Sequence, residues 1–442
     1  MNEEKKALID QENEKFASAL EKLKGKLNEK NSSLIDKKQK KKTLSIKMGI
    51  VGVGQAGSRV AEVFSKLGYE SCVINTSSQD LEFIDIPDNR KLLLEGTLGG
   101  TGKDLELGRE IFSENYDKIQ SFIDDIVTPS NMIYLIISGG GGTGSSSVET
   151  MIPMMFETGK PVGVIYILPK GTEDAQSKKN SLETLSKLAK LSSSNSISSL
   201  VVVDNSKIET IYANLSQSKF WESANAAIVE PIDVFNHLTS RPSRFTSLDP
   251  SDFGKIISTG DCSVYGVIEV DNYMDETALA EAVIESLNSN MLAEGFDLTQ
   301  TRVGGVIISG SKDVLDRLPA ININYCFYMI SEQTKGASIY QGIYDVDSNT
   351  DSVKIYTWFA GLGLPKTRID ALKEESKAQV LQASMKESDR QSRMSISLDE
   401  DTQSSNVASD IHKKIQRKNS SFNRLQTTTP SGNSIIDMRR KK

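Results

Sequence analysis

Apolar runs and amphipathic stretches alternate along the first half of this chain. Runs such as MIYLIIS and GVIYIL indicate strands buried on both faces, because apolar side chains occupy consecutive positions. The stretches between them place apolar residues at intervals of three and four, which is the period of a helix. This pattern predicts strands at residues 46–53, 70–75, 90–95, 132–138, 162–168 and 198–203, with helices at 57–67, 104–126, 146–158 and 175–191.

This order predicts an α/β fold with a mainly parallel, doubly wound sheet and helices on both faces. Any ligand is then expected above the carboxyl ends of the strands. Further along, the pattern predicts a smaller α+β second domain and a last helix beginning near Thr367. Its strands are expected at residues 263–270, 303–311, 326–333 and 354–361, and its helix at 277–292.

The stretch SGGGGTGSSS, from Ser138 to Ser147, lies between a predicted strand and a predicted helix. Glycines at such a place let backbone N–H groups close on an anion, and the helix N-terminus adds its positive end. Thr143 and Ser145–Ser147 are expected to add hydroxyl donors. The stretch lacks the Lys-Ser/Thr ending of a P-loop, so no lysine of this loop reaches the phosphates. The alternative is a flexible glycine linker.

A second glycine loop, GVGQAGS, follows the first predicted strand. Its Gly52, Gly54 and Gly57 fit the spacing of a dinucleotide-binding fingerprint, which also requires an acidic residue at the end of the second strand. That strand ends in Asn75-Thr76 instead. A dinucleotide-dependent oxidoreductase is therefore the weaker interpretation.

Four segments, GVGQAGS, INTSSQDL, GTLGGTGKDLELG and SGGGGTGSSS, resemble in order and spacing the nucleotide loops of the tubulin/FtsZ superfamily of GTPases. The third resembles the loop that senses the γ-phosphate. ILPKGTED resembles the ribose-side loop, and VVVDNSKI resembles the segment before the long central helix, expected at Phe220–Leu238. VKIYTWFAGLGLPK resembles the end of the second domain in plasmid- and phage-encoded, TubZ-like members. The resemblance spans about residues 47–378.

The resemblance implies a site for GTP with Mg²⁺, without assigning any residue as a metal ligand. Asn225 falls on the family's base-contacting asparagine; its amide suits the guanine edge, or it is an ordinary helix residue. The implied nucleotide-binding residues are Gly54, Gln55, Ala56, Asn75, Gly99, Gly100, Thr101, Gly140, Gly141, Gly142, Thr143, Gly144, Ser145, Glu173, Asn205 and Asn225.

RPSRFTSLDPSDFGKII resembles the loop after the central helix, which in this superfamily acts on the GTP of the next subunit. Asp249 and Asp252 are the implied catalytic residues. Their spacing presents both carboxylates on one helix face, where they can polarise water and organise a cation. Asp249 before Pro250 is also a good helix start, so an N-cap role stays open. Two residues depart from the family: Ser146 stands in place of a glycine and Ser247 in place of an asparagine.

The resemblance implies a polymerising GTPase that forms head-to-tail filaments and hydrolyses GTP at subunit interfaces. The TubZ-like ending and the terminal MRRKK favour segregation or positioning of plasmid or phage DNA. The alternatives are an FtsZ-like division filament and a non-polymerising nucleotide-binding regulator. The implied partners are further copies of the chain and a DNA-binding adaptor or acidic partner of the C-terminal tail.

Composition agrees with a globular cytoplasmic protein that is not inserted into a membrane. No apolar run approaches 18 residues and no signal-peptide pattern is present. Three widely separated cysteines and two histidines argue against a disulfide framework, a zinc site or histidine-based catalysis. Residues 1–47 carry 13 basic and 8 acidic side chains, and residues 413–442 carry 9 and 1, which leaves a net charge of −20 between them. The acidic body is a poor nucleic-acid surface, whereas the basic ends can bind acidic partners.

The chain divides into six expected parts. Residues 1–47 form an extension in which Phe16, Leu20, Leu23 and Leu27 make a narrow apolar stripe, either a docking helix or a solvated arm. The GTP-binding domain spans 48–219, the central helix and linker 220–245, the second domain 246–365, and a C-terminal helix 366–390. Residues 391–442 have the composition of a disordered basic tail.

Overall fold

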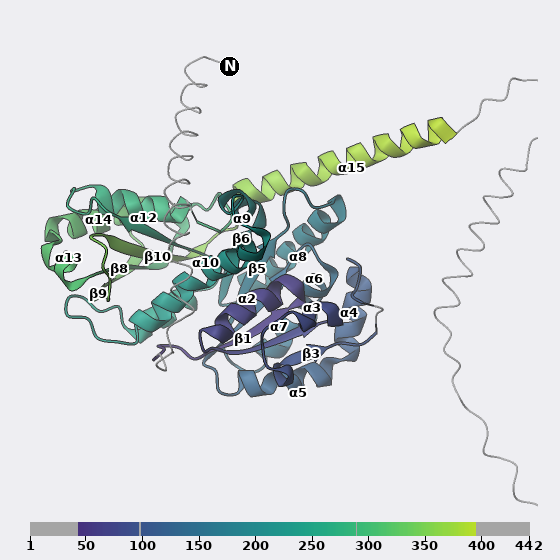
Figure 1. Ribbon diagram of the computed structural model, residues 1–442, viewed down its shortest axis with the longest axis horizontal. Helices are drawn as coiled ribbons and strands as arrows, with labels where there is room; N and C mark the ends of the chain where they lie inside the picture. Colours follow the sequence, from purple (N-terminus) through teal and green to yellow (C-terminus); the bar gives the residue numbers. More distant parts are fainter. Residues whose placement is uncertain (1–42, 97–98, 289, 395–442) are drawn as a thin grey trace, which may run out of the picture. The chain divides into compact units, whose positions relative to one another are not determined.

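The structure is a computed structural model that describes residues 43–96, 99–288 and 290–394 (Figure 1). The predicted N-terminal stripe and the basic tail lie outside the described residues. The chain divides into two units at Leu381, and the description that follows concerns the first. The strands are β1 Met48–Val53, β2 Glu70–Asn75, β3 Lys91–Leu93, β4 Met132–Ser138, β5 Val162–Leu168, β6 Ser199–Asp204, β7 Cys262–Val270, β8 Val303–Gly310, β9 Ser338–Asp345 and β10 Val353–Leu362.

The helices join these strands and extend the chain after the last of them. They are α2 Gly54–Lys66, α3 Ser78–Glu82, α4 Leu105–Glu114, α5 Tyr116–Val127, α6 Gly142–Ser146, α7 Val148–Phe156, α8 Ala175–Ser193, α9 Asn205–Ile211, α10 Gln217–Leu238, α11 Pro250–Ile257, α12 Ala278–Asn288, α13 Lys312–Arg317, α14 Ala320–Gln333 and α15 Lys366–Met394, with short 3₁₀ turns at Asp88–Arg90 and Leu298–Gln300.

Within the described residues, ten strands form one sheet in the order β3-β2-β1-β4-β5-β6-β7-β10-β8-β9. All neighbouring strands are parallel except β10, which is antiparallel to both β7 and β8. The predicted α/β class with a mainly parallel sheet is confirmed.

Helices cover both faces of the first part of the sheet. Side chains alternate between the faces along a strand, so Gly49 and Gly52 of β1 point to opposite sides. A Cβ on Gly49 would lie 3.0 Å from Ile126 of α5, whereas one on Gly52 would lie 2.5 Å from the Gly57 carbonyl of α2. The two glycines thus let a helix approach β1 closely from each side.

The strand order reverses between β1 and β4. From β1 the chain moves outward through β2 and β3, and from β4 it moves the other way through β5 and β6. Loops that follow β1 and β4 therefore turn to opposite faces and leave a crevice at their carboxyl ends. Such a switch point is where doubly wound sheets bind ligands.

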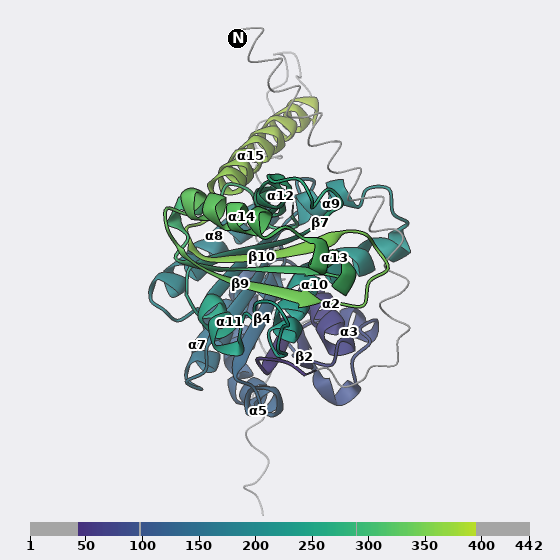
Figure 2. The same ribbon diagram turned by 90° about the vertical axis from the view of Figure 1, so that its left-hand side faces the viewer.

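The second domain continues the same sheet. Its β7 joins β6 through only two residue pairs, Leu200 with Cys262 and Val201 with Ser263. Helices α12 and α14 cover one face, and α10 and α11 contact the other (Figure 2).

The expected strand at 326–333 is wrong, because these residues form the end of α14. The inner face of this helix is formed by Asn322, Cys326 and Ile330, which recur every four residues. The Asn322 side chain donates to the carbonyls of Tyr273, Met274 and Asp275, so a polar residue belongs to the buried face.

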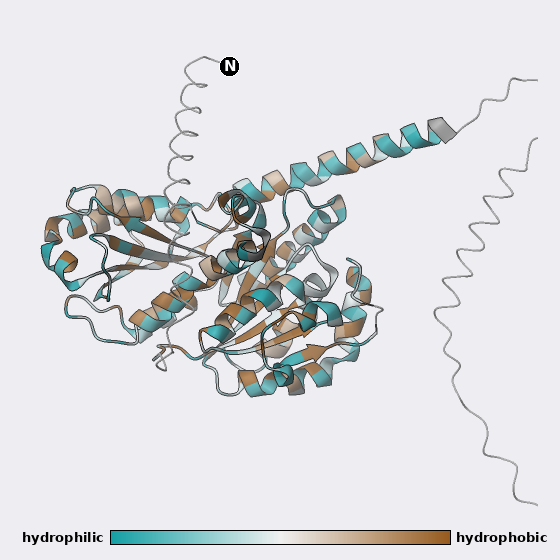
Figure 3. Cartoon of the chain, viewed as in Figure 1, coloured by the Kyte–Doolittle hydropathy of each residue, from teal (hydrophilic) through white to brown (hydrophobic). Residues whose placement is uncertain are grey.

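The helix expected at 104–126 is two helices. Asn115 ends α4, since its side-chain amide donates to the Ile111 carbonyl at 2.8 Å. The hydropathy colouring of Figure 3 shows apolar strands in the interior and a largely hydrophilic α15. A core cluster surrounds Trp358, whose ring contacts Phe235 of α10 and Phe253 of α11.

Candidate functional site

Two glycine loops meet in the crevice between β1 and β4. Gly54 follows β1 with a φ of +74°, a conformation that favours glycine. A Cβ at this position would lie 3.3 Å from the Gly144 backbone nitrogen. The loop after β1 and the glycine run after β4 are therefore in direct contact, as their shared place at the switch point requires.

The helices that begin at these loops have uncapped N-termini. Neither Val53 before α2 nor Gly141 before α6 offers a capping side chain. In contrast, Asp104, Asp174 and Asp204 cap α4, α8 and α9. The first N–H groups of α2 and α6 thus remain as donors beside the crevice.

The glycine run is packed too closely for side chains. A Cβ on Gly142 would lie 1.9 Å from Thr101 Oγ1, and one on Gly140 would lie 2.7 Å from Glu173 Oε2. One on Gly144 would lie 3.0 Å from the Ser138 carbonyl oxygen. Three predicted loops, at residues 99–104, 138–145 and 169–174, therefore pack against one another beside the crevice.

The serine hydroxyls of the glycine run bond carbonyls of their own turn. Ser145 Oγ donates to the Gly139 carbonyl at 2.8 Å, Ser146 Oγ to that of Thr143 at 3.2 Å, and Ser147 Oγ to that of Gly144 at 2.8 Å. In the structure these three hydroxyls brace the turn, and the expectation that they serve as anion donors stays a prediction.

Ser146, which stands where the family has glycine, is accommodated by a glycine on the facing helix. A Cβ on Gly108 of α4 would lie 2.2 Å from Ser146 Oγ. The extra hydroxymethyl group therefore fills space that Gly108 leaves empty.

The loop before α4 carries an unsatisfied hydroxyl. Thr101 is buried, and its Oγ1 has no hydrogen-bond partner among the described residues. The loop bends through the left-handed region at Gly99, Gly100, Gly102 and Lys103. Successive turns of this kind direct backbone N–H groups into a concavity that suits an anion.

A carboxylate outside the predicted site residues organises the loop after β2. Asp80 accepts hydrogen bonds from Gln55 Nε2 at 2.9 Å and from Asn75 Nδ2 at 3.3 Å. Thr76 Oγ1 lies 2.7 Å from Thr143 Oγ1 and so joins this loop to the glycine run. Two predicted nucleotide-binding residues, Gln55 and Asn75, are thereby held in fixed positions, while Ala56 lies half-buried in the first turn of α2.

Hydrogen bonds to α9 and α15 hold the predicted ribose-side loop in place. Glu173 Oε1 accepts from the Lys170 N–H at 2.9 Å, and the Glu173 carbonyl accepts from Gln379 of α15 at 2.8 Å. The Gly171 N–H donates to Ser206 Oγ, next to the predicted Asn205.

A buried ion pair fixes α15 beside this loop. Arg368 and Asp204 are 7% and 3% exposed, and Arg368 Nε lies 3.0 Å from Asp204 Oδ2. Arg368 also contacts Glu375 at 2.8 Å and Ser206 Oγ at 3.1 Å. Burial raises the pKa of Asp204, and the Arg368 guanidinium opposes this rise.

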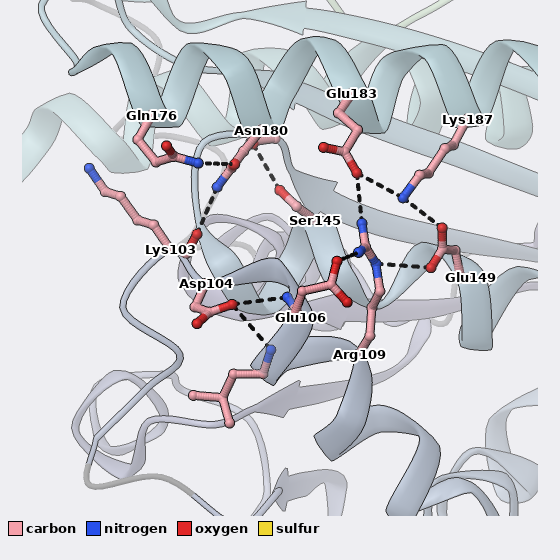
Figure 4. Close-up of polar contacts among 12 residues, drawn as sticks. Lys103, Asp104, Glu106, Arg109, Ser145, Glu149, Gln176, Asn180, Glu183 and Lys187 are labelled. Carbon is pink, nitrogen blue, oxygen red and sulfur yellow. Dashed lines mark hydrogen bonds and ion pairs between the residues drawn. The ribbon is translucent and has the colours of Figure 1, made fainter. Parts of the chain in front are cut away.

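Ion pairs also connect the helices that flank the glycine run (Figure 4). Arg109 of α4 contacts Glu149 of α7 at 2.9 Å and Glu183 of α8 at 2.7 Å, in addition to Glu106. Lys187 contacts the same two carboxylates of α7 and α8. The loop before α4 is therefore anchored at its helical end to both neighbouring helices.

The predicted base-contacting residue lies near an aromatic side chain that the sequence analysis missed. Asn225 is buried in α10, and Trp221 precedes it by one helical turn on the same face. Lys170 Nζ lies 5.0 Å and Arg59 Cζ 5.4 Å from the centroid of the partly buried Trp221 ring. The signal in the sequence is the spacing of four between Trp221 and Asn225.

The predicted catalytic carboxylates lie at the other end of α10. Asn236, in its last turn, bonds both backbone groups of Ile46, just before β1 begins. A helix of 22 residues is about 33 Å long. Asp249 and Asp252 cap and begin α11, which packs on this end of α10 through the stacked rings of Phe235 and Phe253, whereas the glycine loops follow the carboxyl ends of β1 and β4.

Asp249 does cap α11, since its Oδ1 accepts from the Asp252 N–H at 2.9 Å. Asp252 contacts Lys255 Nζ at 2.9 Å, and this carboxylate raises the pKa of the Lys255 ammonium group. The capping bond uses one oxygen of Asp249, and the residue is exposed, so the second oxygen remains accessible. The capping role and a catalytic role are compatible.

The described residues contain no helix long and apolar enough to cross a membrane. A family model described as the GTPase domain of the Tubulin/FtsZ family matches residues 47–213. A second, described as the C-terminal domain of TubZ-like proteins, matches residues 234–373.

The chain is also similar to individual tubulin-like proteins. The chain is 28% identical to the tubulin-like protein CetZ of Pyrococcus horikoshii over 322 residues, which cover 71% of this chain and 85% of CetZ. It is 24% identical to the tubulin-like protein TubZ of Bacillus cereus over 362 residues, or 75% and 82% of the two chains. A GTPγS-form protofilament of Bacillus thuringiensis serovar israelensis TubZ superposes with a TM-score of 0.71 at 18% identity, covering 80% of this chain and 96% of that one, which is a likeness of fold.

Proposed function

Because the chain belongs to the tubulin/FtsZ family, with a TubZ-like C-terminal domain, we propose that it is a GTPase that assembles head to tail. GTP binds at the carboxyl edge of the sheet, and its hydrolysis requires Asp249 and Asp252 of the next subunit. The observation that carries this proposal is the position of the glycine loops and of Asp249 and Asp252 at opposite ends of α10.

The phosphates of GTP are proposed to bind where the three loops meet. The uncapped N-termini of α2 and α6 supply N–H donors, and the unsatisfied Thr101 hydroxyl supplies another. The glycines there are required because a Cβ would collide with the facing loops and displace the backbone that is proposed to hold the phosphates. Bound Mg²⁺ would neutralise phosphate charge; such ions are held largely by phosphate oxygens and water, with few protein ligands.

The base is proposed to lie against α10. The Asn225 amide can both donate to and accept from the guanine edge. Trp221, one turn earlier, offers a ring on which a purine can stack. Tryptophan fluorescence provides a test, because the other tryptophan, Trp358, is fully buried in the second domain. GTP should change the emission of the wild type but not of Trp221→Phe, and ATP should compete weakly.

Hydrolysis is proposed to depend on a neighbouring subunit. The roughly 33 Å of α10 prevents Asp249 and Asp252 from reaching the nucleotide of their own chain. In a head-to-tail contact they would approach the nucleotide of the neighbour and orient the attacking water. A head-to-tail contact whose rotation does not close into a ring produces a filament, which is the assembly proposed here.

The filament is proposed to position or segregate plasmid or phage DNA. The support is the TubZ-like C-terminal domain and the basic composition of residues 413–442, which can bind an acidic partner or a DNA-bound adaptor.

The decisive test compares Asp249→Asn and Asp252→Asn with Asp313→Asn, which removes an exposed carboxylate elsewhere in the second domain. Unassembled subunits of all three variants should bind fluorescent GTP as the wild type does. Phosphate release should fall about 100-fold or more for the first two only, as expected when a water-positioning group is lost. Their filaments, followed by light scattering, should outlast those of the wild type.

Three results would contradict the proposal in different ways. Loss of GTP affinity in unassembled Asp249→Asn would show that the carboxylate acts on its own nucleotide. Equal competition by ATP would remove the guanine assignment. Hydrolysis per subunit that does not change with protein concentration would favour a non-polymerising regulator.

A further inference from the structure

Lys103 has an unusual backbone conformation beside the glycine run. Its φ of +69° is in the left-handed region, which three of its neighbours enter as glycines. This conformation is unfavourable for a lysine, and such strain tends to be retained where a side chain has a task. It is stabilised by Asn180, whose Nδ2 donates to the Lys103 carbonyl at 2.9 Å (Figure 4).

Asn180 is itself fixed in place. It is buried in α8, and its Oδ1 accepts from Gln176 Nε2 at 2.7 Å. The backbone of Lys103 is thereby held against the glycine run: its Cα would lie only 3.1 Å from a Cβ on Gly142. The ammonium group is on a flexible four-carbon stem that starts at the edge of the proposed phosphate site.

In the structure the ammonium group bridges two nucleotide loops. Lys103 Nζ lies 2.5 Å from Oδ2 of Asp174, the residue that caps α8 at the end of the ribose-side loop. Both side chains are accessible, at 39% and 58% exposure. Ion pairs with this exposure contribute little to stability, so Lys103 can readily exchange Asp174 for a stronger partner.

On the premise of the proposed function, we propose that the Lys103 side chain binds the terminal phosphate of GTP and releases Asp174 when it does so. The glycine run has no lysine where a P-loop carries one, because Gly144 is followed by Ser145, Ser146 and Ser147. Lys103 supplies that missing cation from a different loop. A terminal phosphate carries more charge than a carboxylate and forms strong charge-assisted hydrogen bonds with ammonium groups.

A second observation points to the same ligand. Thr101, two residues earlier, is 5% exposed, and its Oγ1 lacks a partner among the described residues. This hydroxyl would lie 1.9 Å from a Cβ on Gly142, so it faces the glycine run from the same loop as Lys103. The loop therefore presents a hydroxyl to the glycine run and carries, two residues later, a lysine whose Cα lies against the same glycine.

The exchange makes Lys103 sensitive to the nucleotide state. GDP lacks the terminal phosphate, so with GDP bound Lys103 pairs with Asp174 and connects the loop before α4 to α8. With GTP bound the same loop is connected to the nucleotide. The Arg109 ion pairs keep α4 in place, which limits the change to Lys103 and the residues beside it.

The test measures GTPγS and GDP affinities of full-length chains below the concentration of assembly. Lys103→Asn removes the charge but tolerates the left-handed backbone. It should weaken GTPγS binding about tenfold or more and GDP binding less than twofold. Lys103→Arg should retain most of the GTPγS affinity, and Lys179→Asn, an exposed lysine of α8, should change neither affinity.

Asp174→Asn separates this proposal from a structural role of the ion pair. If Lys103 exchanges partners, removing the competing carboxylate should strengthen GTPγS binding relative to GDP. If the pair only ties the two loops together, Lys103→Asn, Asp174→Asn and the double variant should weaken both nucleotides equally, which would overturn the inference. A wild-type chain that binds no GTPγS would overturn the proposed function, and this inference with it.

Discussion

Replacing Arg368 with methionine should release the first turns of α15 from the GTPase domain. Methionine retains the approximate length of the side chain but leaves the Asp204 carboxylate, which is 3% exposed, with only the Ser206 N–H as a direct hydrogen-bond partner among the described residues. Removing one member of a buried ion pair costs about 3–5 kcal/mol. The matched control, Lys377→Met, breaks a pair with Glu374 in which both side chains are more than 70% exposed, worth about 0–1 kcal/mol.

Hydrogen exchange followed by mass spectrometry is the suitable assay, because the pair fixes one segment and not the whole molecule. Protection of the amides in residues 366–381 should fall by roughly 100- to 3,000-fold in Arg368→Met. The control should change it by roughly fivefold at most. Peptides that contain the Glu173 carbonyl should also exchange faster, since Gln379 of α15 donates to that group.

The loss of amide protection in Arg368→Met should depend on pH. Burial already raises the pKa of Asp204 above its ordinary 3.8, and loss of the guanidinium raises it further. A carboxyl group whose pKa is higher in the folded state stabilises the fold at low pH and loses that contribution as pH rises through the folded pKa. The difference in amide protection between the variant and the wild type should therefore grow from pH 5 to pH 8.

A double variant tests whether the buried charge is the cause. Asp204→Asn retains the oxygen that caps α9 while removing the charge, so Asp204→Asn combined with Arg368→Met should recover much of the lost protection. Equal exchange in Arg368→Met and Lys377→Met would refute the reasoning. A double variant no better than Arg368→Met would assign the effect to packing instead.

Three further outcomes follow from the site and the tail. Gly142→Val should abolish nucleotide binding because its Cβ would lie 1.9 Å from a hydroxyl of the facing loop, whereas Gly254→Ala, with no contact shorter than 4.0 Å, should bind normally by calorimetry. The Lys103 ammonium group lowers the pKa of the Asp174 carboxyl to about 2, so NMR should show this carboxyl titrating at higher pH in Lys103→Asn. In the wild type, the contribution of Asp174 to stability should be lost as pH falls from about 4 to about 2. Deleting residues 413–442 should weaken binding of an acidic partner, with a steep dependence on salt in the wild type only; unchanged binding would remove that role of the tail.

The strands of the GTPase domain could be predicted from the sequence, whereas its short helices α3 and α9 could not. Strands buried on both faces read as continuous apolar runs, and β4 and β5 have the predicted bounds, 132–138 and 162–168. Glycine loops directly after apolar runs also indicated which edge of the sheet forms a site, because carboxyl ends of parallel strands share one edge.

The second domain was harder to predict because polar residues belong to its interior. Counting only apolar positions in α14 hides the four-residue period, since Asn322 lies on the buried face. The aromatic and β-branched run that follows then resembles a strand. The true strand β9 lies at the edge of the sheet with only part of it buried, so its alternation is weak.

Contacts between distant segments could not be predicted in the site. The glycine loops were found by motif, but the directions of the Ser145–Ser147 hydroxyls depend on a turn that closes on its own carbonyls. The pairing of Arg368 with Asp204 joins residues 164 positions apart. The Lys103 ion pair similarly requires two loops to meet over the glycine run.

The contact between Gly108 and Ser146 restricts the order in which the chain can change. With serine at 146, any side chain at 108 collides with it, and with alanine at 108 the serine in turn has no space. Each position thus determines which residues the other tolerates. A mutational path that introduces alanine at 108 must first replace the serine at 146, although neither substitution alters the charge or the fold class. Deep mutational scanning of position 108 should therefore give different sets of tolerated residues in the wild-type and Ser146→Gly backgrounds.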